Sequence, residues 1–322
     1  MLKGNSKLMC LIKRKIQTAV VTGPTGSIGQ ALCRLLLSKG IKVYAVCKPK
    51  SHRAKTLPNH MGMHIISCDI KDMEKLPEKL NTSRADAFFH FAWVGNDGDN
   101  RNSMELQTDN IRYAIDACNA AHQLGCKIFI GAGSQAEYGR TNMVLSPNTP
   151  CFPENGYGMA KLCAGQMTRA VCHKIGIEHI WPRFLSVYGP YEQTTSMTIS
   201  TIIKLLKGEI PKLTAGEQLW DYLYTNDAAD GLYRMMISGR DGAVYTIGGG
   251  HSQPLRKFVE ILRDAIDPEI PIDFGAVPYA DNQIMFLKVD NSAITADTGF
   301  IPHTNFKDGI KETVEWVRGI MQ

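Results

Sequence analysis

The feature that most constrains the fold is a glycine-rich loop near the N-terminus, Thr22-Gly23-Pro24-Thr25-Gly26-Ser27-Ile28-Gly29. It lies between a β-rich run at residues 17–22 and a helical stripe of apolar residues at 27–38. Glycine is required where a backbone turns tightly, approaches a pyrophosphate, or lets a helix pack closely on a strand. The N-terminus of the following helix offers free N–H groups to phosphates. The loop therefore predicts a dinucleotide site, with contacts from Gly23, Thr25, Gly26, Ser27, Ile28 and Gly29.

Strand-like and helix-like segments alternate after this loop. Further strands are expected at residues 42–47, 64–68, 87–92, 127–132 and 178–187, and helices at 104–124 and 157–174. The strands are continuous apolar runs, which indicates a parallel sheet covered by helices on both faces. The predicted fold class is therefore α/β, a doubly wound Rossmann parallel sheet with a smaller α/β C-terminal substrate lobe.

The predicted division of the chain gives an NAD(P)-binding Rossmann domain at residues 16–187 and a substrate-binding lobe at 188–322. After Tyr188-Gly189-Pro190 the elements become shorter and turn residues more frequent, which marks the boundary. The segment at 226–250 is expected to return to the first domain. Residues 1–15 carry five Lys/Arg without the apolar core of a secretory signal, and are interpreted as a basic N-terminal extension.

Composition argues against several classes of function. The net charge of +5 is spread along the chain, with no Lys/Arg run interleaved with aromatics, so no nucleic-acid partner is expected. No apolar run approaches the ~20 residues that a membrane span needs, so no membrane association is expected. The nine cysteines are scattered and form no Cys-x-x-Cys pair, which favours reduced thiols and a cytoplasmic location. The nine histidines lack the spacing of metal ligands, so no metal site is predicted.

The end of the second predicted strand indicates which nicotinamide cofactor is bound. An NAD enzyme commonly has a carboxylate there, which accepts hydrogen bonds from the ribose hydroxyls. This chain has Val46-Cys47-Lys48-Pro49-Lys50-Ser51-His52-Arg53, without a carboxylate and with three cations where a 2′-phosphate would lie. NADP(H) is therefore favoured, with contacts from Lys48 and Arg53. NAD(H) stays open, because a solvated basic loop would have the same composition.

Two further segments carry groups suited to proton transfer. Tyr157 and Lys161 are four residues apart, hence on one face of a predicted helix. A nearby ammonium favours the phenolate, so the tyrosine can give a proton to a carbonyl oxygen or take one from a hydroxyl. Ser134 follows the strand predicted at 127–132, at the sheet edge where a hydroxyl can stabilise a reacting oxygen. We therefore predict Ser134, Tyr157 and Lys161 as the catalytic group, with Tyr157 and Lys161 also contacting the cofactor.

These motifs resemble those of the extended short-chain dehydrogenase/reductase family, which includes nucleotide-sugar epimerases, dehydratases and reductases. The resemblance runs from Gln17 onward and includes the segments Arg183-Phe184-Leu185-Ser186-Val187-Tyr188-Gly189-Pro190 and Trp220-Asp221-Tyr222-Leu223-Tyr224. It implies a nucleotide-sugar substrate and a homodimer formed through the helices at 104–124 and 157–174. It also implies cofactor contacts from Asp69, Ile70, Phe91 and Ala92, and substrate contacts from Trp93, Gln135, Tyr138 and Ser186. For Asp69 a role as a turn residue, and for Trp93 and Tyr138 a position in the core, remain open.

Departures from the family pattern narrow the activity. Ser186 stands where the family usually has an asparagine, and Trp220 replaces the usual arginine, a candidate phosphate partner. The family's sugar 4,6-dehydratases carry an Asp-Glu pair where this chain has Gln135 and Ala136. Because the elimination of water needs an acid and a base beside the hydride site, a dehydratase is disfavoured. The sugar and base pockets are expected from loops around residues 94–102, 191–197 and 278–285, whose side chains do not identify the base.

Three functions remain. The first is an NADP(H)-dependent oxidoreductase that reduces a 4-keto (deoxy)sugar nucleotide by hydride transfer, with Tyr157 as proton donor. The second is an NAD-dependent nucleotide-sugar 4-epimerase, similar to UDP-glucose 4-epimerase, which returns the hydride to the other face of the sugar. The third is a non-catalytic dinucleotide-binding sensor on the same fold, which typically lacks the Tyr/Lys pair that this chain keeps. The basic segment after the second strand favours the reductase, which consumes NADPH.

Overall fold

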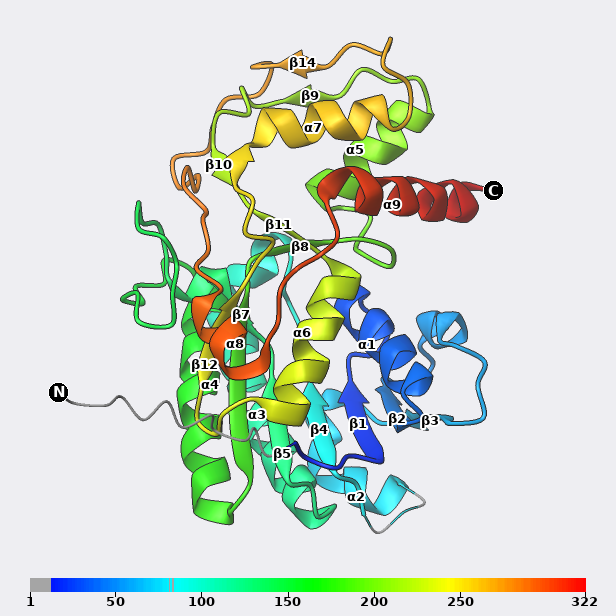
Figure 1. Ribbon diagram of the computed structural model, residues 1–322, viewed down its shortest axis with the longest axis vertical. Helices are drawn as coiled ribbons and strands as arrows, with labels where there is room; N and C mark the ends of the chain where they lie inside the picture. The colour runs from blue at the N-terminus through cyan, green and yellow to red at the C-terminus, as the bar shows by residue number, and fades with distance from the viewer. Residues whose placement is uncertain (1–12, 81, 83) are drawn as a thin grey trace, which may run out of the picture.

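The computed structural model describes residues 13–80, 82 and 84–322, so most of the predicted extension at 1–15 lies outside the described residues. A central sheet has the strand order β12-β7-β5-β4-β1-β2-β3, and a short strand, β6, also pairs with β7 (Figure 1). Every pairing in this sheet is parallel. The prediction of an α/β fold with a doubly wound parallel sheet is confirmed. The strands are β1 (Thr18–Thr22), β2 (Lys42–Cys47), β3 (Met63–Ser67), β4 (Ala87–His90), β5 (Ile128–Gly131), β6 (Gly133–Ser134), β7 (Glu178–Phe184) and β12 (Val244–Ile247).

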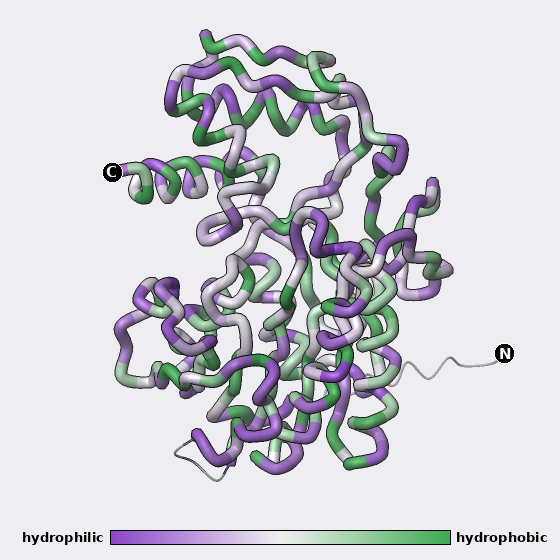
Figure 2. Tube along the Cα trace, turned by 180° about the vertical axis from the view of Figure 1, so that it is seen from behind, coloured by the Kyte–Doolittle hydropathy of each residue, from purple (hydrophilic) through white to green (hydrophobic). Residues whose placement is uncertain are grey.

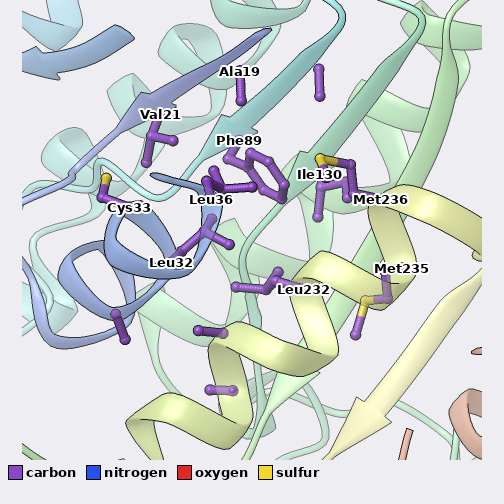
Figure 3. Packing of buried hydrophobic residues seen from close by; sticks show 14 of the residues in the cluster. Ala19, Val21, Leu32, Cys33, Leu36, Phe89, Ile130, Leu232, Met235 and Met236 are labelled. Atoms are coloured by element: carbon purple, nitrogen blue, oxygen red, sulfur yellow. The ribbon is translucent and has the colours of Figure 1, made fainter. Parts of the chain in front are cut away.

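Helices cover both faces of this sheet: α1 packs beside α6 on one face, and α3 packs beside α4 on the other. Neighbouring residues of a strand point to opposite faces, so Phe89 joins the core under α1 and α6 while Phe88 joins the core under α3. Figure 3 shows the first core, in which Leu36 of α1 and Leu232 of α6 lie on the same side of the sheet as Ile130. The helices are α1 (Ser27–Ser38), α3 (Met104–Gln123), α4 (Gly156–Ile175) and α6 (Thr225–Ser238).

Elements from late in the chain also belong to this layered unit. The strand β12 pairs in parallel with β7, and α8 (Ser292–Thr298) packs against α6 and β12. Tyr245 of β12 and Ile294 of α8 are both buried in the core that α1 and α6 share. The position of α8 was not expected from the sequence, because a helix of 7 residues is too short to carry a periodic pattern.

A smaller unit lies beyond the carboxyl ends of the strands, at the top of Figure 1. Its core gathers Tyr188, Ile199, Leu262 and Ile310. Viewed from behind in Figure 2, hydrophobic and hydrophilic segments alternate along both units. Among the described residues, none of the helices combines the length and the apolar content that a bilayer span requires. The elements of the smaller unit are α5 (Met197–Leu206), β9 (Lys212–Leu213), β10 (Leu219–Trp220), β11 (Tyr222–Tyr224), β13 (Gln253–Pro254), α7 (Leu255–Asp264), β14 (Asp273–Phe274) and α9 (Phe306–Met321).

Two strands end at least two residues earlier than the sequence predicted. The strand expected at 87–92 ends at His90, because the amides of Phe91 and Ala92 donate to Thr22 Oγ1 at 3.1 and 3.2 Å. The strand expected at 178–187 is divided at Leu185. Its last part, β8 (Ser186–Tyr188), leaves the central sheet and pairs with β11 of the smaller unit. Both breaks fall at the carboxyl edge of the sheet, where the chain opens to form a cavity.

Candidate active site

A cavity of about 380 Å³ lies at the carboxyl edge of the sheet, facing the smaller unit. The glycine loop forms one part of its wall, and Ser134, Tyr157 and Lys161 form another. The structure therefore brings the predicted cofactor loop and the predicted catalytic group to the same cavity. The predicted site residues that line it are Gly23, Gly26, Ser27, Ile28, Gly29, Arg53, Phe91, Trp93, Ser134, Tyr157 and Lys161.

The remaining predicted site residues do not line this cavity. Asp69 caps η2 (Ile70–Lys75), where its carboxylate accepts a hydrogen bond from the Lys71 amide at 3.2 Å. Tyr138 is buried and donates its hydroxyl to the Ser146 carbonyl oxygen at 2.9 Å. The others are Thr25, Lys48, Ile70, Ala92, Gln135 and Ser186.

The glycine loop turns tightly between β1 and α1. Gly23 has a φ of +66°, and a Cβ on it would lie 2.8 Å from the Ala92 amide nitrogen. A Cβ on Gly29, in the first turn of α1, would lie 2.3 Å from the Gly23 carbonyl oxygen. Because neither position carries a side chain, the loop packs tightly on itself and on the segment just after β4, and the N-terminus of α1 lines the cavity. The free N–H groups of that first turn fit the pyrophosphate of a dinucleotide.

Ser134 and Tyr157 meet where η4 and α4 begin. Ser134 caps η4 (Gln135–Glu137), and its Oγ accepts a hydrogen bond from the Ala136 amide at 3.2 Å. Tyr157 lies in the first turn of α4, which Asn155 caps by accepting from the Gly158 amide at 2.8 Å. Burial raises the pKa of Tyr157, while the charge of Arg101 and the hydrogen bond with the Ser134 hydroxyl oppose that rise. The two hydroxyls are thus adjacent, as joint contact with one carbonyl oxygen requires.

Lys161 is held by contacts within the protein. Its ammonium donates to the Ala132 carbonyl oxygen at 2.7 Å and lies 3.7 Å from the centre of the Trp93 ring. Trp93 is fixed in turn, because its indole N–H donates to Gln107 Oε1 at 2.9 Å. Burial lowers the pKa of Lys161 to about 7, although the charge of Glu137 acts in the opposite direction. Trp93, predicted as a substrate contact, therefore lines the cavity and also contacts the side chain of Lys161.

The carboxylate nearest to Ser134 in the sequence points away from the cavity. Glu137 is completely buried, and its Oε2 accepts from the Arg183 guanidinium at 2.6 Å. Its Oε1 accepts from the Trp181 indole at 3.0 Å and from the Ser134 amide at 2.9 Å. This carboxylate supports the turn that carries Ser134 and does not provide the acid that a dehydratase needs. The spacing Ser134-x-x-Glu137 is that of a capping box, a signal that could have identified the residue.

Two other features complete the wall and its surroundings. In the loop expected at 191–197, Tyr191, Glu192, Gln193 and Ser196 line the cavity. Arg53, from the basic segment after β2, donates to the Tyr191 carbonyl oxygen at 2.7 Å. This bond joins the loop at 191–197 to the segment where the phosphate of a cofactor is expected. Arg101, which the sequence did not single out, lies over the Tyr157 ring.

Comparison with known sequences identifies the family and several relatives of this chain. A model of the NAD dependent epimerase/dehydratase family matches residues 19–248. The trifunctional UDP-glucose 4,6-dehydratase/UDP-4-keto-6-deoxy-D-glucose 3,5-epimerase/UDP-4-keto-L-rhamnose-reductase of Arabidopsis thaliana is 25% identical, over 94% of this chain and 47% of its own length. The dTDP-glucose 4,6-dehydratase of Neisseria meningitidis serogroup B is 27% identical, over 56% of this chain and 54% of its own. The chain thus spans about half the length of these two relatives.

Solved structures match over nearly the whole chain. The UDP-N-acetylglucosamine 4-epimerase from Methanobrevibacter ruminantium M1, in complex with UDP-N-acetylmuramic acid, has a TM-score of 0.85 and 25% identity, with 96% of this chain and 100% of that chain covered. The UDP-glucuronic acid 4-epimerase from Bacillus cereus, in complex with UDP-glucuronic acid and NAD, has a TM-score of 0.82 and 20% identity, covering 94% and 99%. The second likeness is evidence of a shared fold.

Proposed function

Because the chain belongs to the NAD dependent epimerase/dehydratase family, we propose that it transfers a hydride between NADP(H) and the C4 position of a nucleotide-linked sugar. The activity that we favour is the reduction of a 4-keto (deoxy)sugar nucleotide, with Tyr157 as the proton donor. The observation that carries this proposal is the convergence of Ser134, Tyr157 and Lys161 with the glycine loop on one cavity.

The mechanism assigns one task to each group. A bound NADPH would supply the hydride for the C4 carbonyl carbon. The Tyr157 hydroxyl donates its proton to the carbonyl oxygen, so that the ketone becomes a carbinol and the phenol a phenolate. Ser134 donates a hydrogen bond to the same oxygen and stabilises the negative charge that develops on it. The ammonium of Lys161, with a pKa of about 7, can then return a proton to the phenolate.

The preference for NADP(H) over NAD(H) is part of the proposal. It is supported by Arg53, which lines the cavity, and by the absence of a carboxylate from the segment after β2. Changing Arg53→Gln removes a charge-assisted bond to a 2′-phosphate, worth roughly 1.5–3 kcal/mol, so the Kd of NADPH should rise about ten- to hundredfold. The Kd of NADH should stay the same. Both constants are measured by fluorescence titration.

A matched control for this measurement is Lys55→Gln. Lys55 is exposed on the same short helix, η1 (His52–Thr56), and does not line the cavity. Lys55→Gln should leave the Kd of NADPH and the Kd of NADH unchanged, since it removes only a charge that lies away from the cavity. Tighter binding of NADH than of NADPH by the unmodified protein would overturn the cofactor preference.

A 4-epimerase is the second candidate, favoured by the likeness to the UDP-N-acetylglucosamine 4-epimerase of Methanobrevibacter ruminantium M1. The same three catalytic groups serve both reactions, because an epimerase first removes the hydride and then returns it to the other face. Two incubations distinguish the reductase from the epimerase: one with NADPH and a dTDP-4-keto-6-deoxy sugar, the other with UDP-glucose. Stoichiometric consumption of NADPH supports the reductase. Conversion of UDP-glucose to its C4 epimer without net consumption supports the epimerase.

We also propose a homodimer through α3 and α4. These helices pack side by side, and methionines on them are exposed: Met104 is 56% exposed, Met159 46% and Met167 43%. Burial of such side chains would favour association. Light scattering on the purified protein should give twice the mass of the chain, and Met167→Glu should lower it towards the monomer. A monomeric unmodified protein at micromolar concentration would contradict this proposal.

A further inference from the structure

A second cation lies against the proposed catalytic phenol. The guanidinium carbon of Arg101 is 4.2 Å from the centre of the Tyr157 ring, within the range of a cation–π contact. The ammonium of Lys161 is 5.7 Å from that ring and lies closer to Trp93, 3.7 Å from the centre of its ring. Of the two cations, Arg101 is therefore the one in closer contact with the phenol ring.

The segment that carries Arg101 is fixed to the start of α4. In η3 (Gly98–Asn102), Asn102 Oδ1 accepts a hydrogen bond from the Gly156 amide at 3.1 Å. A Cβ on Gly156 would lie 3.0 Å from the Arg101 carbonyl oxygen, so the absence of a side chain there permits the close approach. The Arg101 guanidinium also donates to the Asn96 carbonyl oxygen at 3.0 Å. The contact with the neighbouring Tyr157 thus follows from the way two backbone segments dock.

The charges around Tyr157 differ in how they respond to pH. Burial lowers the pKa of Lys161 to about 7, so near neutral pH a substantial part of it is uncharged. An arginine stays charged throughout the range of protein titrations. Glu137 is the nearby anion and, together with burial, raises the pKa of Tyr157, which Arg101 opposes. His90, next to Lys161, is neutral, because burial lowers its pKa to about 3.

We propose that Arg101 is a positioning residue for Tyr157, holding the phenol ring against η3 and supplying a permanent positive charge that favours the phenolate. The Tyr/Lys spacing in the sequence assigns this electrostatic task to Lys161, and the geometry adds Arg101 as a second cation beside the ring. The inference rests on the proposed role of Tyr157 as the proton donor. Contact with the cofactor and the return of the proton remain the tasks proposed for Lys161.

The test measures the titration of the phenol directly. A 3,5-difluorotyrosine is incorporated in place of Tyr157, and its ¹⁹F resonance is followed against pH in the full chain. A cation beside a phenol favours the phenolate, so removing that cation must raise the midpoint. In Arg101→Met the midpoint should rise by about one pH unit, and in Arg101→Lys by less than half of that.

Turnover gives the second readout. A weaker acid donates its proton less readily, so Arg101→Met with the natural tyrosine should lower kcat at neutral pH by up to about tenfold. The pH dependence of kcat should move upward with the midpoint, while the Kd of NADPH stays within about twofold. Arg101→Lys should recover most of the rate.

The matched control is Arg112→Met. Arg112 lies over the ring of Tyr113 on α3, at 5.2 Å, so the same kind of contact is removed away from the cavity. In Arg112→Met, the midpoint of the fluorinated tyrosine at position 157 and the turnover with the natural tyrosine should equal those of the protein that keeps Arg112. An unchanged midpoint in both Arg101→Met and Arg101→Gln would overturn the inference. If the midpoint rises but no sugar nucleotide is converted, the proposed function fails while the electrostatic role of Arg101 stands.

Discussion

Tyr157→Phe should lower the turnover of the sugar nucleotide by roughly 10²–10⁴-fold, the range expected when a positioned acid is removed. The variant keeps the ring that packs against Arg101 and Trp93, at 4.2 Å from the guanidinium carbon and 6.1 Å between ring centres. The hydroxyl is lost, and with it the proton that the carbonyl oxygen receives and the hydrogen bond with Ser134. The Kd of NADPH should therefore stay within about threefold, because the glycine loop that fits the pyrophosphate is untouched.

The measurement is single-turnover oxidation of NADPH by a 4-keto sugar nucleotide, with cofactor binding measured on the same preparation. Tyr233→Phe serves as the matched control, since it removes a hydroxyl from α6 at a position that does not line the cavity. That control should retain the unmodified rate. If Tyr157→Phe also kept the rate within a few fold, another group would have to supply the proton, and the proposed mechanism would be wrong.

The sequence could predict those features of the site that depend on local spacing. The glycine loop, a strand and a helix are consecutive in the chain, so their joint geometry follows from one short segment. Tyr157 and Lys161 share one face of α4, and their spacing alone brings them together. The parallel sheet follows similarly, because runs such as Phe88-Phe89 are buried on both faces.

The contacts that surround these groups could not be predicted, because they join segments far apart in the sequence. Arg101 reaches Tyr157 only because η3 docks on the start of α4. Glu137 meets Arg183 across two elements, and composition gives no sign of which acid pairs with which base. The division of the strand at 178–187 depends on the pairing of β8 with β11, which belongs to the smaller unit.

The second large effect concerns stability. Glu137→Gln should lower the free energy of unfolding by about 3–5 kcal/mol, the cost expected when one partner of a buried ion pair is lost. Arg183 would keep its charge with its side chain only 5% exposed, without the carboxylate that now accepts from it at 2.6 Å. Denaturant unfolding measures the change. The exposed pair of Arg140 and Glu154 gives the matched control, since Glu154→Gln should cost no more than about 1 kcal/mol.

A double variant separates the charge from the hydrogen bonds. The amide oxygen of Glu137→Gln can still accept from the Trp181 indole and the Ser134 amide, so those two groups keep a partner. Adding Arg183→Met removes the uncompensated cation and replaces it with an apolar side chain that fits a buried site. The double variant should therefore recover most of the lost free energy of unfolding. If it were less stable than Glu137→Gln alone, the loss would have to come from packing around Arg183, whose guanidinium lies 4.7 Å from the centre of the Tyr138 ring.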